Sequence, residues 1–142
     1  MNMIEFEVLC LSKSVGRMKE FEKTIFFEKT YSALKRVALD TLPLILHINY
    51  PQGQQILRKI DENSYIRFPR KPQHEEDELD IDMSLVDAAA YMVMASYETQ
   101  RAKIYMGLYY TEIENNNSKL IETDLVNTTN DNFDETAVGE FV

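Results

Sequence analysis

The stretch "LDIDMSLVDAAAYMVMASYETQRAKIYMGLYYTEIENNN", residues 79–117, decides the fold class of this chain of 142 residues. Small and apolar residues dominate 84–96, and further apolar residues follow at three- and four-residue spacing. This spacing is the period of an α-helix. The stretch therefore predicts a helical pair, in which one face of the second helix packs against the first; that face carries Tyr105, Met106, Tyr109 and Ile113.

The second helix of the pair carries a wider apolar stripe than one core contact needs, because Ile104 and Leu108 add to it. Wide coverage on one helix indicates two partners, one inside the domain and one outside it. Gly107 interrupts the stripe, although glycine in a helix costs about 1 kcal/mol relative to alanine. We expect this glycine to permit a close approach to the first helix or contact with a neighbouring molecule.

An earlier helix is predicted from the amphipathic pattern of residues 17–40, where lysines and glutamates fill the face opposite the apolar one. It opens near Met18, and Pro43 ends it, because the residue before a proline is driven out of the helical region. Residues 1–17 are predicted to be either a short strand or a loosely held arm, and the sequence leaves both open.

A β-hairpin over about residues 54–69 follows from the alternation in "QILRKIDENSYIRFPRKP", residues 55–72. A two-stranded hairpin is marginal alone, so it must pack on a helix or on a neighbouring subunit. The segment is also the most basic part of the chain. We expect its cations to face an acidic neighbouring surface, and this docking set is Arg58, Lys59, Arg67, Arg70 and Lys71.

Acidic residues fill the linker "QHEEDELDID", residues 73–82, and recur in the C-terminal tail, residues 118–142. The last carboxylates of the linker precede a helix, where the helix dipole favours negative charge, and Ser84 with Asp87 approximates a capping box. Low hydrophobicity with net negative charge predicts a flexible tail that becomes ordered on a partner. The expected anchors of this tail are Phe133, Phe141 and Val142.

The predicted fold class is therefore α+β and mainly helical, with an N-terminal helix, a short β-hairpin, a C-terminal helical pair and a flexible acidic tail. One domain spans 18–117. The net charge of −9 is divided unevenly, since residues 1–71 carry 12 basic and 8 acidic side chains and residues 72–142 carry 3 and 16. An acidic surface repels nucleic acid, which argues against tight DNA binding.

No arrangement of residues typical of catalysis is present in the sequence. His47 lies in an apolar run, where a structural histidine is more common than a catalytic one. His74 stands beside three acidic residues but lacks the spacing of a known metal motif. Cys10 is the sole cysteine, which fits a reducing compartment. We therefore expect no enzyme activity, no cofactor and no metal. We also expect no membrane span, because no apolar run is long enough to cross a bilayer.

The order of elements over about residues 18–117 resembles the head-to-tail adaptor (connector) proteins of tailed bacteriophages. The resemblance rests on "IDMSLVDAAAYMVMA", on "ETQRAK" and on the tyrosine-rich last helix. It implies a virion protein of the neck, assembled in the host cytoplasm as a homo-oligomeric ring, a dodecamer, between the portal protein and the tail proteins. DNA would pass through the lumen without specific binding. The first 17 residues and the acidic tail depart from a minimal adaptor.

Two other functions fit parts of the sequence. The 16 acidic residues of 72–142 would suit an inhibitor that imitates phosphate charge and binds a nucleic-acid-handling enzyme. A metal-dependent hydrolase that uses the acids near His74 is the weaker alternative. An inhibitor is expected to be a monomer or dimer that competes with DNA, whereas an adaptor forms large oligomers or binds a ring-shaped partner.

Overall fold

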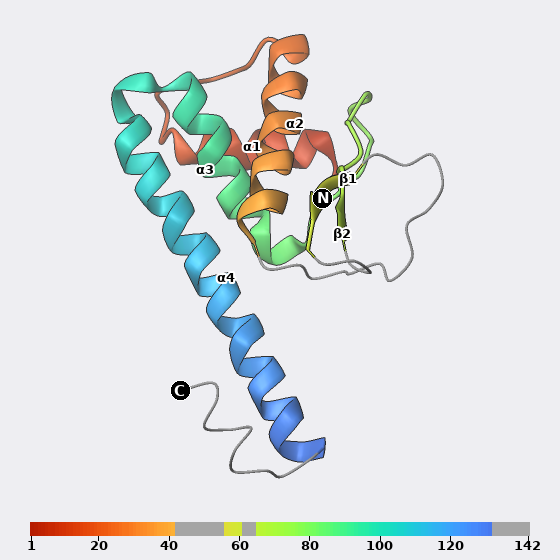
Figure 1. Cartoon of the computed structure of the whole chain (residues 1–142). Helices are drawn as coiled ribbons and strands as arrows, with labels where there is room; N and C mark the ends of the chain where they lie inside the picture. Colours follow the sequence, from red (N-terminus) through yellow and green to blue (C-terminus); the bar gives the residue numbers. More distant parts are fainter. Residues whose placement is uncertain (42–55, 61–64, 132–142) are drawn as a thin grey trace.

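The structure is a computed structural model that describes residues 1–41, 56–60 and 65–131, with the backbone alone described over 120–131. Within these residues, four α-helices form the body and a two-stranded antiparallel hairpin lies beside the C-terminal end of α2 (Figure 1). The predicted class, α+β and mainly helical with a short hairpin, is confirmed. No helix in the described part of the chain is long and apolar enough to cross a membrane.

Helix α3, Val86–Tyr97, lies at the centre of the body and packs against α1, α2 and α4. Its residues Ala88, Ala89 and Ala90 are fully buried. Three successive residues point in different directions around a helix, so these methyl side chains allow close neighbours on several sides. The larger core side chains come from the surrounding helices.

The start of α3 differs from the predicted capping box of Ser84 and Asp87. A 3-10 turn, η1, Met83–Leu85, precedes the helix, and Asp82 is its N-cap. The Oδ1 of Asp82 accepts hydrogen bonds from the N–H and the Oγ–H of Ser84, at 2.9 and 2.6 Å. The cap therefore lies two residues earlier than predicted.

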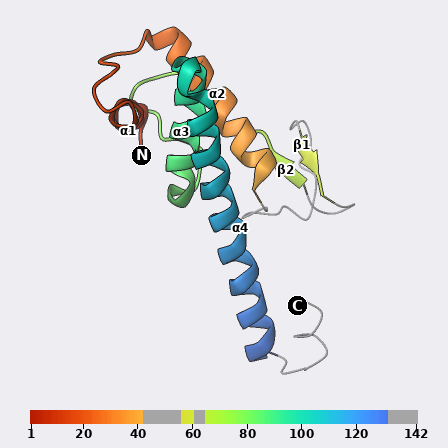
Figure 2. The same cartoon turned by 90° about the vertical axis from the view of Figure 1, so that its left-hand side faces the viewer.

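Helix α4, Ala102–Asp131, follows a second 3-10 turn, η2, Thr99–Arg101. Its first turns pack along α3, and the rest extends well past the ends of α2 and α3 (Figures 1 and 2). The predicted boundary at 117 was therefore too early, because residues 118–131 continue the helix. Leu120, Ile121 and Leu125 keep apolar residues at helical spacing in this segment.

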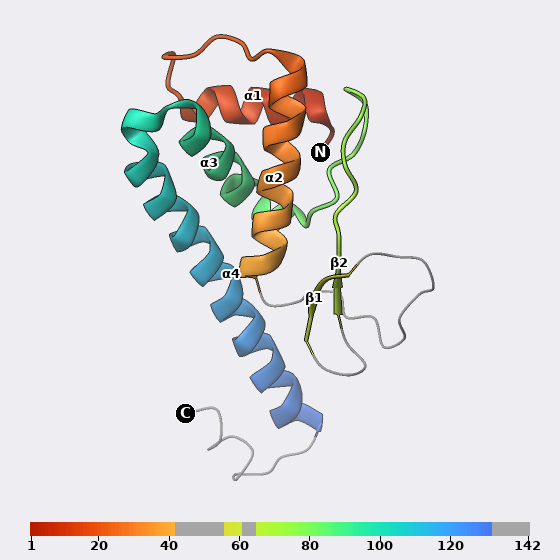
Figure 3. The same ribbon diagram turned by 45° about the horizontal axis from the view of Figure 1, so that its top comes forward.

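Residues 3–13 form α1, Met3–Lys13, which corrects the expectation of a strand or a loose arm for 1–17. A capping box starts the helix: Asn2 Oδ1 accepts from the N–H of Glu5, and Glu5 Oε1 accepts from the N–H of Asn2. Met3, Phe6 and Cys10 then lie buried on one face, at the spacing of a helix that packs on a core. Figure 3 shows α1 lying across one end of α2 and α3.

Helix α2, Lys23–Asp40, begins five residues after the predicted start at Met18. Glu22 is its N-cap and accepts from the N–H groups of Thr24 and Ile25, at 3.2 and 2.7 Å. Phe21 precedes the cap, and its ring stacks on the ring of Phe26 near the start of the helix. The predicted stop at Pro43 lies outside the described residues. At the end of α2, the Thr41 N–H donates a 3.0 Å hydrogen bond to the Val37 carbonyl.

The hairpin pairs β1, Ile56–Lys59, with β2, Tyr65–Arg67, in antiparallel register. A register shift between Ile56 and Arg58 marks a bulge in β1. Tyr65 is fully buried, and Arg58 of β1 donates a 3.1 Å hydrogen bond to the Leu39 carbonyl of α2, so the hairpin is tied to the body.

Tyr109 is the largest fully buried side chain of α4 among the described residues. It is fully buried, and its hydroxyl donates a 2.7 Å hydrogen bond to Asp40 at the end of α2. Burial raises the pKa of this hydroxyl above its ordinary value, which favours the neutral phenol that donates this bond. One side chain thus anchors two helices.

We expect Tyr109→Ala to lower the free energy of unfolding by about 3–5 kcal/mol, the usual cost of truncating a buried aromatic side chain. Tyr109→Phe keeps the ring and should cost only about 1 kcal/mol, through the lost hydrogen bond. The matched control is Tyr110→Ala, because Tyr110 is the exposed neighbour on the same helix. Urea unfolding at low protein concentration measures all three; equal effects of Tyr109→Ala and Tyr110→Ala would contradict the assigned core.

Candidate interaction surfaces

Helix α4 presents two apolar faces, and the body covers only one of them. Tyr105, Tyr109 and Ile113 are buried on the face that packs in the common core with α3, and Met106 is partly buried beside them. The opposite face is open to solvent, with Ile104 exposed to 60% and Leu108 to 41%. We call Ile104, Gly107, Leu108 and Thr111 the α4 stripe.

Gly107 lies within the α4 stripe and does not face α3. A Cβ atom built at this residue has no atom within 4 Å, so the glycine does not serve a close approach inside the described chain. This corrects the first of the two roles expected from the sequence. On a helix surface, residues three and four positions away are neighbours. By this geometry the missing side chain leaves a gap in the side-chain cover of the helix, a hole between positions 103, 104, 110 and 111, and no side-chain atom lies within 4 Å of a Cβ built there.

Helix α1 also has a second apolar face. Ile4 is exposed to 50% and Val8 to 64%, one helical turn apart and on the side away from buried Phe6 and Cys10. Leu11 continues this row one turn further, where it is partly buried and packs against the edge of the core. We call Ile4, Val8 and Leu11 the α1 stripe. Sequence reasoning missed it because α1 itself was not predicted; the signal was the pair Asn2 and Glu5, which forms the capping box.

Val15 extends the apolar surface just beyond the end of α1. It is exposed to 80% and has a φ of 51°, in the left-handed region. A β-branched residue with positive φ is a conformational outlier, and such strain typically costs about 1–3 kcal/mol. Gly16 follows with a φ of 83°. Val15 is therefore an exposed apolar residue in a left-handed backbone conformation that valine rarely adopts.

The predicted docking set of basic residues does not form a free cationic surface, because several of its members bind within the chain. Arg67 donates to both carboxylate oxygens of Asp80, the second at 2.8 Å from Nη2, and the Arg70 guanidinium lies 3.8 Å from the same carboxylate. Lys71 pairs with Glu28 at 2.6 Å. In the hairpin, Arg58 donates to a backbone carbonyl at the end of α2, and Lys59 also has an interaction partner.

The acidic linker is likewise occupied by internal contacts. Glu78 pairs with the N-terminal amine at 2.7 Å, and Glu75 pairs with Lys23. Asp77 accepts two backbone N–H bonds, both 2.9 Å, from Gln73 and His74, and these bonds hold the pKa of its carboxyl below the ordinary value. The linker therefore acts as a strap that joins the N-terminus and α2 to the start of α3.

A third polar contact, not foreseen from the sequence, closes the corner between α1 and α4. Arg17 donates to Glu98 at 2.6 Å and to the hydroxyl of Tyr105 at 3.0 Å. The same hydroxyl donates to Glu98 at 2.6 Å. The bond from Arg17 holds the pKa of the Glu98 carboxyl below its ordinary value. The two bonds from Arg17 join residues 81 and 88 positions apart, which no local sequence pattern reveals.

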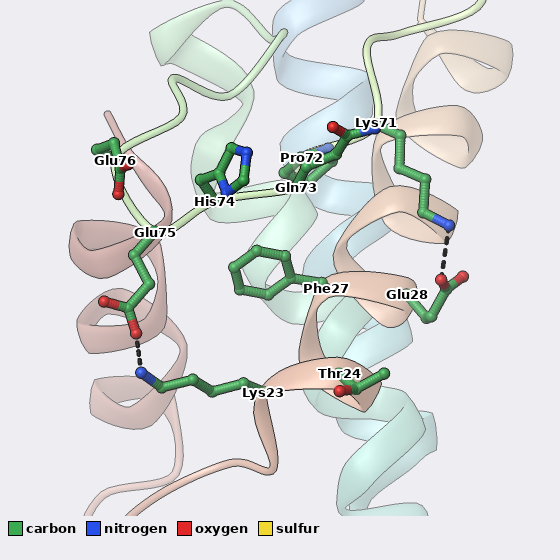
Figure 4. A pocket seen from close by; sticks show the side chains of 10 residues that line it. All are labelled: Lys23, Thr24, Phe27, Glu28, Lys71, Pro72, Gln73, His74, Glu75 and Glu76. Atoms are coloured by element: carbon green, nitrogen blue, oxygen red, sulfur yellow. Dashed lines mark hydrogen bonds and ion pairs between the residues drawn. The ribbon is translucent and has the colours of Figure 1, made fainter.

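The candidate chemical groups are distributed as follows. Cys10 is fully buried, and burial raises the pKa of its thiol, so it is a poor nucleophile. His74 lines an open cleft of about 610 Å³, in which Phe27 lies between the Lys23–Glu75 and Lys71–Glu28 ion pairs (Figure 4). Within the described ranges, no group of three or more histidine, cysteine or acidic side chains could hold a metal ion. His47 lies outside those ranges.

The predicted tail anchors Phe133, Phe141 and Val142 also lie outside the described residues. Comparison with protein-family models, with curated proteins and with solved structures finds no match for the chain. The interaction surfaces are therefore interpreted from their own geometry.

Asp80 offers a test of the strap. Its bonds to Arg67 hold the pKa of the Asp80 carboxyl below the ordinary value of 3.8. The stabilisation is therefore present in full above that value and is lost as the pH falls through the lowered pKa. We expect Asp80→Asn to lower the free energy of unfolding at pH 7 by about 1.5–3 kcal/mol, the range for hydrogen bonds to charged groups.

The difference between Asp80→Asn and the wild type should shrink as the pH falls below 3.8. Urea unfolding between about pH 3 and pH 7, a range that spans the ordinary carboxyl pKa, measures this difference. Glu76→Gln is the control, since Glu76 is an exposed acid of the same linker. A difference that stayed constant down to the lowest pH would show that the carboxylate charge does not hold the strap.

Proposed function

We propose that the protein is a non-catalytic structural subunit, a head-to-tail adaptor of a tailed bacteriophage or prophage that forms an oligomeric ring. The observation that carries this proposal is the α4 stripe, an apolar helix face that the chain's own body leaves uncovered. Ile104 and Leu108 expose apolar side chains one helical turn apart, and exposed apolar surface that is contiguous is a candidate site for another macromolecule. The α1 stripe is a second such surface, on another helix.

The shape of the chain supports a role in joining other proteins. Helix α4 has 30 residues, so it is about 45 Å long, and only its first part lies against α3. Its remainder extends beyond the helical body (Figures 1 and 2). A projecting helix offers surface to neighbours that the compact body cannot reach. In the proposed neck, those neighbours are the portal protein on one side and tail proteins on the other.

The charge distribution fits a ring through which DNA passes. Residues 72–142 carry 16 acidic and 3 basic side chains, so this half stays net acidic although Glu75, Glu78 and Asp80 pair with cations of the chain. A lumen lined by such a surface would repel the phosphate backbone, so DNA would slide through without specific binding. This part of the proposal needs no base-reading residues.

The alternative, an inhibitor that imitates phosphate charge, is less well supported. It requires a row of free carboxylates, and the linker is the densest acidic segment of the sequence. Glu75, Glu78 and Asp80 each pair with a cation of the same chain. A basic target would have to compete with these contacts, so the linker is a poor imitation of a phosphate backbone.

The decisive experiment is to measure the mass of the purified protein by light scattering and native mass spectrometry, and to image it by negative-stain electron microscopy. We expect closed rings, dodecamers, alone or after addition of the portal protein of the same virus. A protein that stays monomeric and does not bind the portal would overturn the proposal. Competition with DNA for a basic enzyme would instead favour the inhibitor.

A further inference from the structure

We infer that the α1 stripe of one copy packs on the α4 stripe of the next copy, in a heterologous contact between identical chains. This inference deepens the proposed function. It rests on that function in one respect, which is that copies of the chain associate. Its evidence is the match between the two stripes in spacing, in charge and in shape.

The spacing of the two stripes is the same. Ile4 and Val8 stand one helical turn apart on α1, and Ile104 and Leu108 stand one turn apart on α4. Both pairs are exposed, whereas the opposite face of each helix is buried in the common core with α3. Because both helices pack on α3 through their buried faces, their stripes point outward from the body. A second copy is therefore needed to bring an α1 stripe onto an α4 stripe.

The charges beside the stripes are opposite in sign. Glu7 flanks the α1 stripe, and Lys103 stands beside the start of the α4 stripe. Glu5 and Arg101 have the same signs as these neighbours, but Glu5 also caps α1 and Arg101 lies 4.0 Å from Glu98. Charged residues at the rim of an apolar contact fix its register and select its partner. If two α1 stripes packed on each other, the rim residues of both copies at the start of α1 would be acidic, and like charges would share one contact. Pairing α1 with α4 brings opposite charges together.

Gly107 gives the third part of the argument. It lies in the interior of a helix, where glycine is unfavourable, and no atom of the described chain lies close to where its side chain would be. A hole on one helix surface accepts a side chain from a facing helix. Val8 is the most exposed residue of the α1 stripe and is of suitable size. We assign Val8 of the neighbouring copy to the hole at Gly107.

A contact of this kind uses two different surfaces of each chain. Each copy offers an α1 stripe to one neighbour and an α4 stripe to another, so the contact repeats from copy to copy. Heterologous contacts generate a ring when the rotation closes and a filament when it does not. The geometry of one chain is thus compatible with the ring in the proposed function.

The first test is Gly107→Ala. Alanine removes the unfavourable helix propensity, so the melting temperature measured below the concentration of association should rise. The added methyl group fills the hole, so self-association measured by analytical ultracentrifugation should weaken by about tenfold or more. Ser32→Ala is the control, because Ser32 is an exposed residue of α2 and lies on neither stripe. It should leave association unchanged.

The second test reverses charge. Lys103→Glu and Glu7→Lys should each weaken self-association by about tenfold or more, because like charges then meet at the contact. Mixing the two variants should restore association, since every α1 stripe then finds an α4 stripe of opposite charge. Native mass spectrometry of the mixture should show assemblies in which the two variants alternate.

Each other outcome contradicts the inference in its own way. Loss of association with Lys103→Glu but not with Glu7→Lys, and no rescue on mixing, would mean that α4 faces something other than α1. Rings that form normally in all the variants would place the contact elsewhere and leave the adaptor proposal intact. A wild-type protein that is monomeric at every concentration would overturn the self-contact, while portal binding would still test the adaptor proposal separately.

Discussion

The packing of three helices around α3 is the constraint on which the rest of the structure depends. Ala88, Ala89 and Ala90 contribute almost no side-chain volume, so the neighbouring helices can approach α3 closely. The bulk of the core must then come from the neighbours, and Phe6, Phe26 and Tyr109 supply it from α1, α2 and α4. A larger residue at the centre of α3 would displace a whole helix, because protein interiors have no spare volume.

This arrangement has a consequence for the surface. A helix that packs on one central neighbour buries about one face, and α1 and α4 each do so against α3. Neither helix has a second layer of protein over it among the described residues. The polar contacts, including the pair of Arg67 and Asp80 and the corner at Arg17, tie loops and strands to the body. The linker also bonds to the Ile4 N–H, but the side chains of Ile4 and Val8 stay 50% and 64% exposed. The uncovered apolar residues are therefore a property of the architecture.

Local patterns were sufficient to predict much of the fold. Helical periodicity located α2, α3 and the start of α4, and alternation located the hairpin, because both depend on neighbouring residues. Helix α1 was missed although its capping box, Asn2 and Glu5, is local. The orientation of Gly107 was also within reach, since it stands two residues from both Tyr105 and Tyr109 and so lies about 200° around the helix from each.

The pairing of charges could not be predicted in the same way. Lys71 reaches Glu28 across 43 positions, and Arg17 reaches Glu98 across 81. The sequence shows the sign of each residue but not which partner the fold will bring to it. A basic hairpin and an acidic linker were therefore interpreted as two external surfaces, whereas Arg67 and Asp80 bind each other.

These internal pairs change which charges remain to select a partner. Surface charges that already pair within the chain add little to recognition, because a partner must displace one ion pair to form another. Most of the linker and part of the hairpin are in this position. The charges beside the α1 and α4 stripes, including Glu7 and Lys103, stand at the edge of apolar surface, where association would remove water from them. Specificity is therefore expected to depend on these few rim residues rather than on the large charge difference between the two halves of the chain.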